Sequence, residues 1–512
     1  MEHKEQFQQA VTNAYKPKGD YIYLGSGLLE TEIIADARVN LALKMMNRHG
    51  LIAGATGTGK TRTLQLIAEQ LSDKGVPVFM LDVKGDLSGL AEAGEAIPAL
   101  SERAEQLEYP YTPAGFPVEL FSLSGDLGAK MRIRISDFGP VLLARVLELN
   151  DTQSGTLSAL FKYAEDHDMG LINLSDLKRL LDYLSSLGAE EIKADYGKIS
   201  SSTAGAILRK IVALEQQGMG SIFGETAFNV QDLFVTRESK GVISLLNISD
   251  IQNQPVLYST FLLSLLDQLF SSLAEVGDPD KPKLIFFFDE SHLLFKDAPQ
   301  AFLSKIDQII RLIRSKGVGV FFCTQSPTDL PENVLAQLGN RVQHALRAFT
   351  PNDVEDLKQT VKTYPKSEFY AIQEVLTQLG TGQALITVLN DKGIPTEVVA
   401  THLIPPRAIM GPLDQKAYDA LLEHSELYKK YKEEVDPESA AEILEKKTAA
   451  LEAEKKQANA NKKTKKRSSS RQTPMEAATK AVTTTLARKL ANAAGGILVG
   501  ILTGMFKKNK KR

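Results

Sequence analysis

Short runs of apolar residues alternate with longer amphipathic stretches along most of this chain. Five such runs, which predict buried strands, lie at residues 49–53, 76–82, 241–247, 283–289 and 318–323. Apolar residues at helical spacing fill residues 61–74, 255–275 and 301–316. Continuous apolar strands alternating with helices are typical of a parallel sheet that helices cover on both faces. The pattern therefore predicts an α/β fold with a mainly parallel sheet.

Weaker strand patterns lie near residues 21–25, 31–35, 342–348, 384–389 and 397–402. Between about residues 100 and 235, strand-like runs become scarce and helical spacing dominates. Helices are expected there at residues 136–148, 152–168, 174–187 and 203–217. We interpret this region as an α-helical insertion within the sheet domain.

After residue 412 the chain becomes helical and charged, and then low in complexity. We therefore expect the following division: an N-terminal lead-in (1–17), the first part of the core (18–99), the helical insertion (100–235), the second part of the core (236–405), a helical C-terminal extension (406–457), a basic flexible linker (458–474) and an apolar and basic tail rich in small residues (475–512). The C-terminal tail is expected to be helical and partly disordered.

The strongest chemical signal lies between the strand at 49–53 and the helix that follows it. It is the run Gly54-Ala55-Thr56-Gly57-Thr58-Gly59-Lys60-Thr61, which matches G-x-x-x-x-G-K-[ST]. The glycines let backbone N–H groups turn toward phosphate oxygens at the start of the helix. Lys60 is expected to reach the β- and γ-phosphates, and the Thr61 hydroxyl to ligate Mg²⁺. A glycine-rich turn without a ligand is the alternative, which the strand and helix on either side disfavour.

A second signal is the apolar strand at 283–289, which ends in two adjacent carboxylates. Asp289 at the strand end is expected to hold Mg²⁺ through water. Glu290 points to the other side of the chain and is a candidate general base that polarises the attacking water. The alternative is a solvated acidic turn. Together with the glycine loop, Glu290 favours hydrolysis over binding alone.

A polar pair, Thr324-Gln325, directly follows the strand at 318–323. In P-loop ATPases of the additional-strand class, an amide at this place senses the γ-phosphate or orients the water. The alternative is that these side chains only satisfy their own turn. The order of the three signals along the chain favours a role for Gln325 in the site.

These motifs, taken in order, resemble the HerA/FtsK superfamily. The resemblance is carried by residues 49–61, 81–86, 288–292 and 323–327, and it spans roughly residues 20–405. Within the superfamily, the chain is similar to bacterial HerA-like proteins that carry a helicase HerA-like C-terminal domain. The resemblance implies a RecA-like P-loop NTPase core that binds ATP with Mg²⁺. It also implies a homo-oligomer, commonly a hexameric ring, that moves or unwinds DNA.

The resemblance also places three polar residues, Asp82, Lys84 and Asp86, in a cluster after the second strand of the core. We expect them to support the site, with a plain turn as the alternative. His292 follows the carboxylate pair, and local packing at a helix start is favoured over a catalytic role. Cys323, the single cysteine of the chain, is most simply a core residue.

Ring ATPases need an arginine that reaches a neighbour's γ-phosphate, because a cation there stabilises the charge of the transferring group. The candidates are Arg311, Arg314 and Arg341, of which Arg314 is preferred. For each of them a structural arginine is the alternative. Against archaeal HerA helicases we expect one departure, the lack of most of their N-terminal barrel domain, which leaves the partner nuclease and the role at DNA ends open.

Charge is distributed unevenly along the chain. The formal net charge is −3, but residues 451–512 carry +13, which leaves −16 for the first 450 residues. A basic domain often marks a nucleic-acid-binding protein, and the main body does not have one. A single cysteine excludes a disulfide framework within the chain, and from the polar N-terminus we expect no secretory signal. We therefore expect a cytoplasmic protein without an integral membrane segment.

The apolar segment 495–506 is too short to span a bilayer. It is expected to dock onto the ring or to self-associate. Peripheral contact with an anionic membrane surface through the terminal basic cluster is an alternative. Two further alternatives are that the basic linker contacts nucleic acid nonspecifically and that the charged segment is only solvated.

Two functions from different classes fit these observations. The leading hypothesis is an ATP-driven DNA translocase or helicase, and the rival is a nucleotide-dependent switch or assembly ATPase that does not move DNA. The negative charge of the first 450 residues slightly favours this second hypothesis. A small-molecule kinase is disfavoured because the Asp-Glu pair directs attack toward water. The sequence carries no base-recognition motif, so ATP rather than GTP rests on the resemblance.

Overall fold

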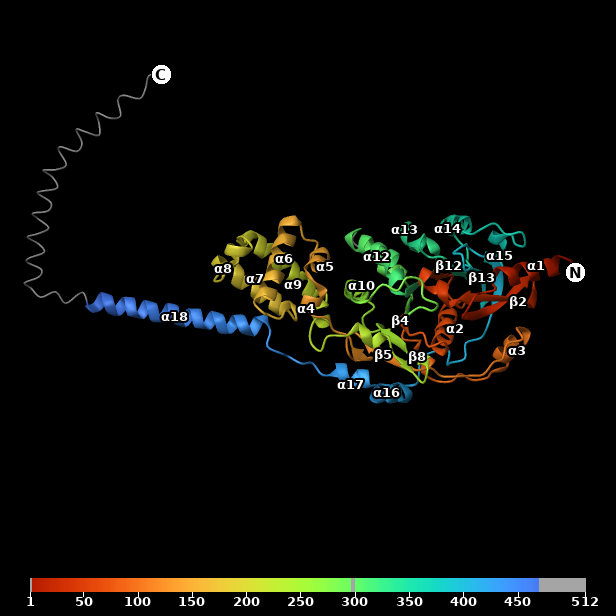
Figure 1. Cartoon of the computed structure of the whole chain (residues 1–512), viewed down its shortest axis with the longest axis horizontal. Helices are drawn as coiled ribbons and strands as arrows, with labels where there is room; N and C mark the ends of the chain where they lie inside the picture. Colours follow the sequence, from red (N-terminus) through yellow and green to blue (C-terminus); the bar gives the residue numbers. More distant parts are fainter. Residues whose placement is uncertain (1, 296–299, 469–512) are drawn as a thin grey trace, which may run out of the picture. The chain divides into compact units, whose positions relative to one another are not determined.

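The computed structural model describes residues 2–295 and 300–468 of the chain (Figure 1). The chain divides into two compact units, Met1–Ala441 and Glu442–Arg512. The first unit contains a 12-stranded sheet. Its strands are β1 (Tyr21–Leu29), β2 (Glu32–Ala42), β3 (Gly50–Ala53), β4 (Val78–Asp82), β5 (Val118–Ser122), β6 (Ala129–Lys130), β9 (Ile243–Asn247), β10 (Leu284–Phe288), β11 (Val318–Thr324), β12 (Asn340–Gln343), β13 (Gln383–Thr387) and β14 (Val399–Leu403). Two short strands, β7 (Thr236–Arg237) and β8 (Lys240–Gly241), pair separately.

The strand order of the sheet is β2-β1-β14-β13-β12-β3-β11-β10-β4-β9-β5-β6. All pairs from β12 to β6 are parallel, whereas the pairs from β2 to β12 are antiparallel. Strand β11 lies between β3, which precedes the glycine loop, and β10, which precedes the carboxylate pair. This order confirms the predicted α/β fold with a RecA-like core and a mainly parallel sheet.

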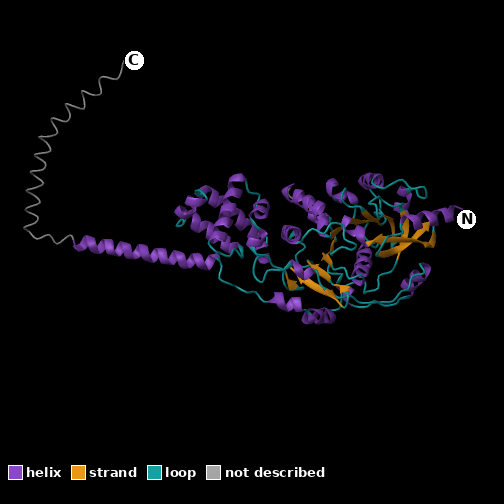
Figure 2. Cartoon of the chain, viewed as in Figure 1, coloured by secondary structure: helices purple, strands orange, loops and turns teal. Residues whose placement is uncertain are grey.

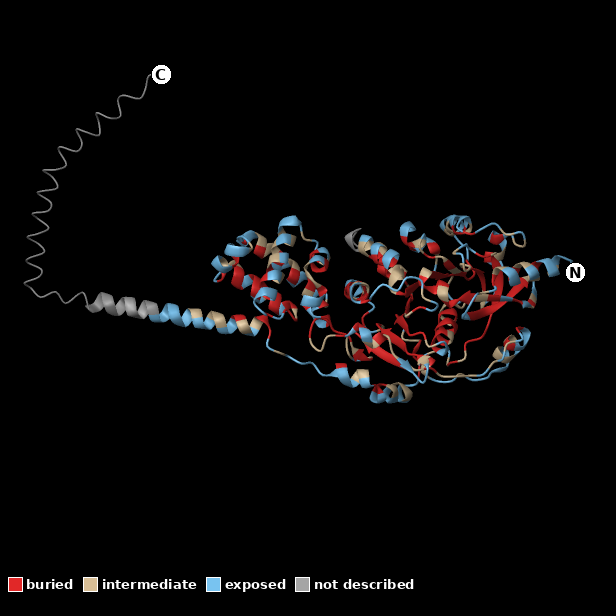
Figure 3. Ribbon diagram, viewed as in Figure 1, coloured by how far each residue is buried: buried red, intermediate tan, exposed pale blue. Residues whose placement is uncertain are grey.

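The central strands are buried on both faces. All five residues of β10 and all seven of β11 are buried (Figure 3). Phe79 on β4 is buried as well. A fully buried phenylalanine side chain contributes about 1.5–3 kcal/mol through the hydrophobic effect. Helices supply the cover on the core: α2 (Lys60–Asp73), α3 (Pro98–Gln106), α10 (Pro255–Ser272), α11 (His292–Phe295), α12 (Gln300–Ile313), α13 (Glu332–Leu335), α14 (Pro351–Lys362) and α15 (Ile372–Gln378).

The N-terminal lead-in, expected to be a polar segment, forms helix α1 (Glu2–Ala14). Phe7 and Val11 on this helix and Tyr15 after it are buried, because residues four apart lie on one face of a helix. The helix packs on the antiparallel hairpin of β1 and β2. Its Phe7 ring also meets the ring of Phe369, between α14 and α15, edge-on, with the ring centroids 5.2 Å apart. The hairpin itself is longer than the two short strands predicted for it.

A run of helices without strands follows β6 (Figure 2). It consists of α4 (Ile135–Phe138), α5 (Pro140–Val146), α6 (Asp151–Asp166), α7 (Leu174–Ser185), α8 (Ala189–Asp195) and α9 (Ser201–Gln216). Asn150 and Asn173 begin α6 and α7 with capping boxes. The region predicted as helical, 100–235, also contains β5 and β6, which continue the main sheet beside β9. Its helical part is therefore narrower than expected, although the domain division itself stays a prediction.

The C-terminal region contains α16 (Gln415–His424), α17 (Glu426–Lys432) and α18 (Ala440–Ser468). Helix α18 includes residues 458–468, which the sequence analysis assigned to a flexible linker. Seven of these eleven residues are Ala, Lys or Arg, which favour a helix. The rest of the linker and the apolar tail lie outside the described residues. Within the part of the chain that the structure covers, no helix is long and apolar enough to cross a membrane.

Candidate functional site

The glycine loop connects β3 to α2, which begins at Lys60. Gly54, Gly57 and Gly59 have φ angles of 152°, 80° and 110°, a region that favours glycine. A Cβ atom on Gly54 would lie 2.5 Å from the Cβ of His344, so a larger residue does not fit there. The N–H of Ala55 donates to the carbonyl of Ala345 at 2.8 Å. The loop is therefore fixed against the end of β12.

Lys60 and Thr61 stand at the first turn of α2, as the motif predicts. The Lys60 ammonium donates to the carbonyls of Gly54 (2.7 Å) and Ala55 (3.2 Å), so it lies across the loop. The Thr58 hydroxyl donates to the carbonyl of Ala55 at 2.7 Å. Thr56 and Gly57 are exposed, and Thr61 is half-buried. The loop thus presents its tip and the helix N-terminus to solvent, where phosphate groups can approach.

Asp289 follows the last residue of β10, two strands away from the glycine loop. Parallel strands end at the same edge of a sheet, so Asp289 lies at the edge that carries the loop. Its Oδ1 accepts the N–H of Glu290 at 2.9 Å, whereas its buried Oδ2 has no hydrogen-bond partner in the described structure. Burial, and then the Glu290 charge, raise the pKa of this carboxyl.

An unpartnered buried carboxylate oxygen is a suitable ligand for a cation. Mg²⁺ is usually bound by one or two protein groups together with phosphates and water. The Thr61 hydroxyl and Asp289 fit this requirement. Among the residues described, no group of three or more His, Cys, Asp or Glu side chains forms a larger metal cluster.

Glu290 has φ 46°, an uncommon backbone conformation for a residue with a side chain. Its Oε1 accepts a hydrogen bond from the Lys84 ammonium at 2.7 Å, and its Oε2 lies 3.5 Å from Nδ1 of His292. Burial is the largest single influence and raises the pKa of this carboxyl, but the hydrogen bond and charge of Lys84, together with His292 and Lys60, bring the pKa below its usual value. Glu290 is therefore ionised, as a general base must be.

The cluster of Asp82, Lys84 and Asp86 divides between a turn and the site. Asp82 is buried and accepts the N–H groups of Gly85 (2.7 Å), Asp86 (3.2 Å) and Leu87 (3.1 Å). Burial raises the pKa of Asp82 to about 6. Asp82 shapes the turn after β4, whereas Lys84 extends from this turn to Glu290.

Gln325 follows the last residue of β11 and is exposed. Because β11 lies between β3 and β10, its end lies between the glycine loop and the carboxylate pair. The neighbouring Thr324 is buried, and its hydroxyl donates to Asp329 at 2.6 Å. The structure thus brings Gln325 to the edge of the sheet where the other predicted site residues lie.

The three candidate arginines lie before or at the beginning of core strands, and thus at the opposite edge of the sheet. Arg314 precedes β11 and lies 3.6 Å from Asp278, and Arg311 pairs with Asp307 at 3.1 Å. The guanidinium of Arg341 donates to three backbone carbonyls, which indicates a structural role. All three line a cavity of about 410 Å³. They therefore lie away from the glycine loop of their own chain.

Two residues that the sequence analysis missed support the glycine loop: His344, directly after β12, and Arg103 on α3, which acts through Gly382 before β13. His344 is buried, and its Nε2 lies 2.9 Å from the Thr63 hydroxyl on α2. Burial lowers the pKa of His344 to about 4, so the ring is neutral. Arg103 donates to the carbonyl of Gly382 at 2.9 Å, and the Gly382 N–H donates to the carbonyl of Thr58 at 3.2 Å. Only the sheet order places β12 beside β3, so no sequence signal points to these contacts.

Comparison with known proteins identifies the family to which this chain belongs. A family model described as "Helicase HerA-like C-terminal" matches residues 29–507. The "DNA double-strand break repair helicase HerA" of Sulfolobus acidocaldarius is 21% identical over 368 residues, covering 71% of this chain and 66% of that protein. The protein of the same name from Sulfurisphaera tokodaii is 22% identical over 355 residues, covering 69% of this chain and 64% of that protein. The chain thus spans less than two thirds of the length of these relatives.

Among solved structures, the chain is similar to the "bacterial conjugative coupling protein TrwBdeltaN70" in its unbound monoclinic form. The identity is 13% and the TM-score 0.49, with 79% of this chain and 92% of that chain covered.

Proposed function

The chain belongs to the helicase HerA-like C-terminal family, and from this premise we propose that it is an Mg²⁺-dependent ATPase that drives movement along DNA or unwinding of DNA. One observation carries the proposal. The glycine loop with Lys60, the unpartnered oxygen of Asp289 and the ionised Glu290 stand at one edge of the sheet, on β3 and β10 with β11 between them. A phosphate loop, a metal ligand and a base are the groups that hydrolysis of a nucleoside triphosphate requires.

Each group has a distinct part in this proposal. The loop N–H groups and Lys60 bind the phosphates, and Lys60 exchanges its present carbonyl partners for phosphate oxygens. Thr61 and Asp289 would hold Mg²⁺, which would neutralise charge on the phosphates. Glu290 accepts the proton of the attacking water, and Gln325 orients that water or senses the γ-phosphate.

We further propose a homo-oligomeric ring in which Arg314 acts on the nucleotide of a neighbouring subunit. The observation in its favour is that Arg314 lies at the sheet edge opposite the glycine loop of its own chain. DNA as the substrate is supported by the relatives, whose names describe DNA repair helicases.

A nucleotide-dependent switch is the second candidate function. The observation that favours it is the charge of −16 on the first 450 residues, which provides no overall attraction for DNA. DNA binding would then need a local basic surface, such as the lining of a ring. The two candidates share the site chemistry and differ in their response to DNA.

Two substitutions test the hydrolytic site. Glu290→Gln removes the base but keeps the size of the side chain, so we expect hydrolysis to fall about 100-fold or more while nucleotide binding persists. Lys60→Ala removes the phosphate contact, and we expect both binding and hydrolysis to be lost. Binding is measured with a fluorescent ATP analogue and hydrolysis by phosphate release, with and without EDTA. Full hydrolysis by Lys60→Ala would refute the site assignment.

A further inference from the structure

The Lys84 ammonium is the direct partner of the proposed base. It lies 2.7 Å from Oε1 of Glu290, whose other oxygen, Oε2, is buried and has no hydrogen-bond partner in the described part of the chain. The side chain of Glu290 is 12% exposed and that of Lys84 is 50% exposed. One carboxylate oxygen is therefore fixed by a hydrogen bond, and the other accepts none among the described residues, although Nδ1 of His292 lies 3.5 Å from it.

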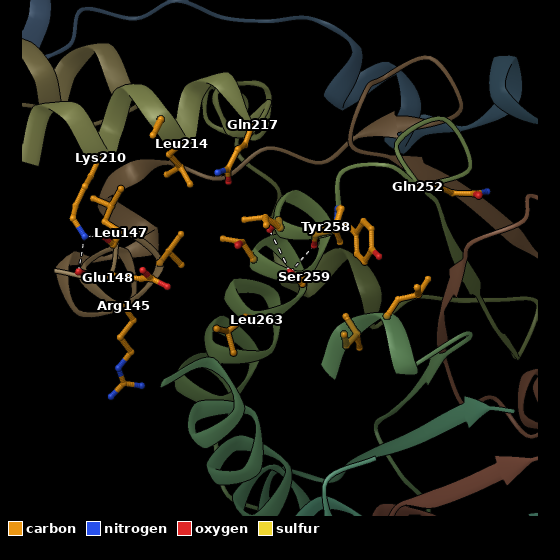
Figure 4. Close-up of a pocket in the computed structure, with 17 residues that line it drawn as sticks. Arg145, Leu147, Glu148, Lys210, Leu214, Gln217, Gln252, Tyr258, Ser259 and Leu263 are labelled. Atoms are coloured by element: carbon orange, nitrogen blue, oxygen red, sulfur yellow. Dashed lines mark hydrogen bonds between the residues drawn. The ribbon is translucent and has the colours of Figure 1, made fainter. Parts of the chain in front are cut away.

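The backbone that carries Lys84 is held from two sides. Asp82 accepts three N–H groups of the turn that contains Lys84, as described above. On the other side, the Gln252 amide donates to the carbonyl of Val83 at 2.5 Å. Gln252 is also one of the residues that line a cavity of about 670 Å³, as are Tyr258 and Ser259 of α10 (Figure 4). The Lys84 side chain thus extends from a fixed point on the chain.

The backbone of Glu290 is also fixed, in an unfavourable conformation. Its φ of 46° is maintained because the N–H and the hydroxyl of Ser291 both donate to the carbonyl of Cys323, at 2.8 and 3.0 Å. Backbone conformations of this kind persist where the surrounding structure over-determines them, and they cluster at functional sites. Backbone contacts place the Cα of Glu290 but do not orient its carboxylate. Within the described residues, Lys84 donates a hydrogen bond to Oε1 at 2.7 Å, and Nδ1 of His292 lies farther away, 3.5 Å from Oε2.

We propose that Lys84 is a positioning residue for the hydrolytic base. Its ammonium fixes Oε1 of Glu290 and thereby presents Oε2 to the attacking water. A base that is oriented by a third group is a recurrent arrangement in catalysis. This inference rests on the proposed function, because it requires Glu290 to act as the base. It assigns the Lys84–Glu290 pair to catalysis rather than to folding, since an ion pair with one half-exposed partner contributes little to stability.

The test compares Lys84→Met with Lys84→Arg and with a control, Lys74→Met. Lys74 is another lysine in an ion pair, 3.1 Å from Asp20, and is remote from the site. We expect Lys84→Met to lower kcat for ATP hydrolysis about 10-fold or more, because misplacement of a catalytic group is costly, and to leave KM within about twofold. Lys84→Arg restores much of the activity, and Lys74→Met behaves as the wild type. Equal thermal melting temperatures show that all variants are folded.

A double variant separates action through Glu290 from direct action on the nucleotide. If Lys84 acts only through the base, Lys84→Met in a Glu290→Gln background lowers the single-turnover rate no further. A further loss in that background would overturn the proposal, because Lys84 would then contact the reacting groups itself. Unchanged or increased kcat in Lys84→Met would also overturn it, the latter because Lys84 would then restrain the base.

The failure of the proposed function gives a different result. In that case the wild type does not hydrolyse ATP, or Glu290→Gln hydrolyses it at the wild-type rate, and no base exists for Lys84 to position. When only the positioning role is wrong, the wild type is active, Glu290→Gln is inactive and Lys84→Met is fully active.

Discussion

At the scale of single residues, Glu69 connects the helix after the glycine loop to the chain that leaves the sheet. It lies on α2 with 2% of its surface exposed, and accepts the N–H groups of Arg407 at 2.8 Å and Ala408 at 3.0 Å. The Gln65 amide donates to it at 3.2 Å. Burial dominates these contacts and raises the pKa of Glu69 from 4.5 to about 7. The folded protein therefore holds a proton on Glu69 over a pH range in which the unfolded chain has released it.

This difference predicts a pH-dependent stability. Because the folded-state pKa is raised, the contribution of Glu69 to stability is largest below pH 4.5 and is lost as the pH rises through about 7. Glu69→Gln does not titrate, so the stability of the wild type relative to this variant should fall by roughly 2–3 kcal/mol between pH 4.5 and 8. Urea unfolding at several pH values measures this difference in the free energy of unfolding. The control is Glu102→Gln, which removes an exposed carboxylate. A difference that does not change with pH would contradict the burial argument.

The candidate site shows how far single residues can be predicted from sequence. Lys60 and Glu290 are predicted because local motifs specify them, and the structure places both at one edge of the sheet. Their roles stay a prediction until the variants are measured. His344 and Arg103 were not predicted, because they meet the glycine loop only through the neighbouring strands β12 and β13. Contacts of this kind depend on sheet order, which no local pattern encodes.

At the scale of elements, the strands that are apolar throughout were predicted to within a few residues, β10 and β11 being examples. Strand β5 was missed because it contains a charged residue, Glu119. This residue is buried and pairs with Arg237 and with Ser425, partners more than 100 residues away in the chain. Helix α1 was missed for a different reason: its apolar residues recur every four positions, but the polar residues between them outnumber these.

At the scale of the whole molecule, the position of Arg314 leads to a prediction about mixed oligomers. Lys60→Ala subunits lack nucleotide but carry Arg314, whereas Arg314→Ala subunits bind nucleotide but receive no arginine from identical neighbours. Each variant alone should hydrolyse ATP about 100-fold more slowly than the wild type or worse, since a trans-acting arginine contributes about 10³–10⁵ to the rate. After subunit exchange, we expect the hydrolysis rate of a mixture of the two variants to exceed the sum of their separate rates several-fold. A mixture whose rate equals the sum of the two separate rates would argue against an arginine that acts on a neighbouring subunit.

The charge of the molecule makes its response to DNA the decisive property. The first 450 residues carry −16, so stimulation by DNA would have to come from a local surface rather than from overall attraction. The measurement that tests the central claim most directly is the steady-state rate of ATP hydrolysis at low salt, with and without duplex and single-stranded DNA, for the wild type and Glu290→Gln. If the protein is a DNA translocase or helicase, we expect at least one form of DNA to raise the wild-type rate of ATP hydrolysis several-fold and to leave Glu290→Gln inactive. Intact hydrolysis that no DNA stimulates would contradict the motor and favour the nucleotide-dependent switch.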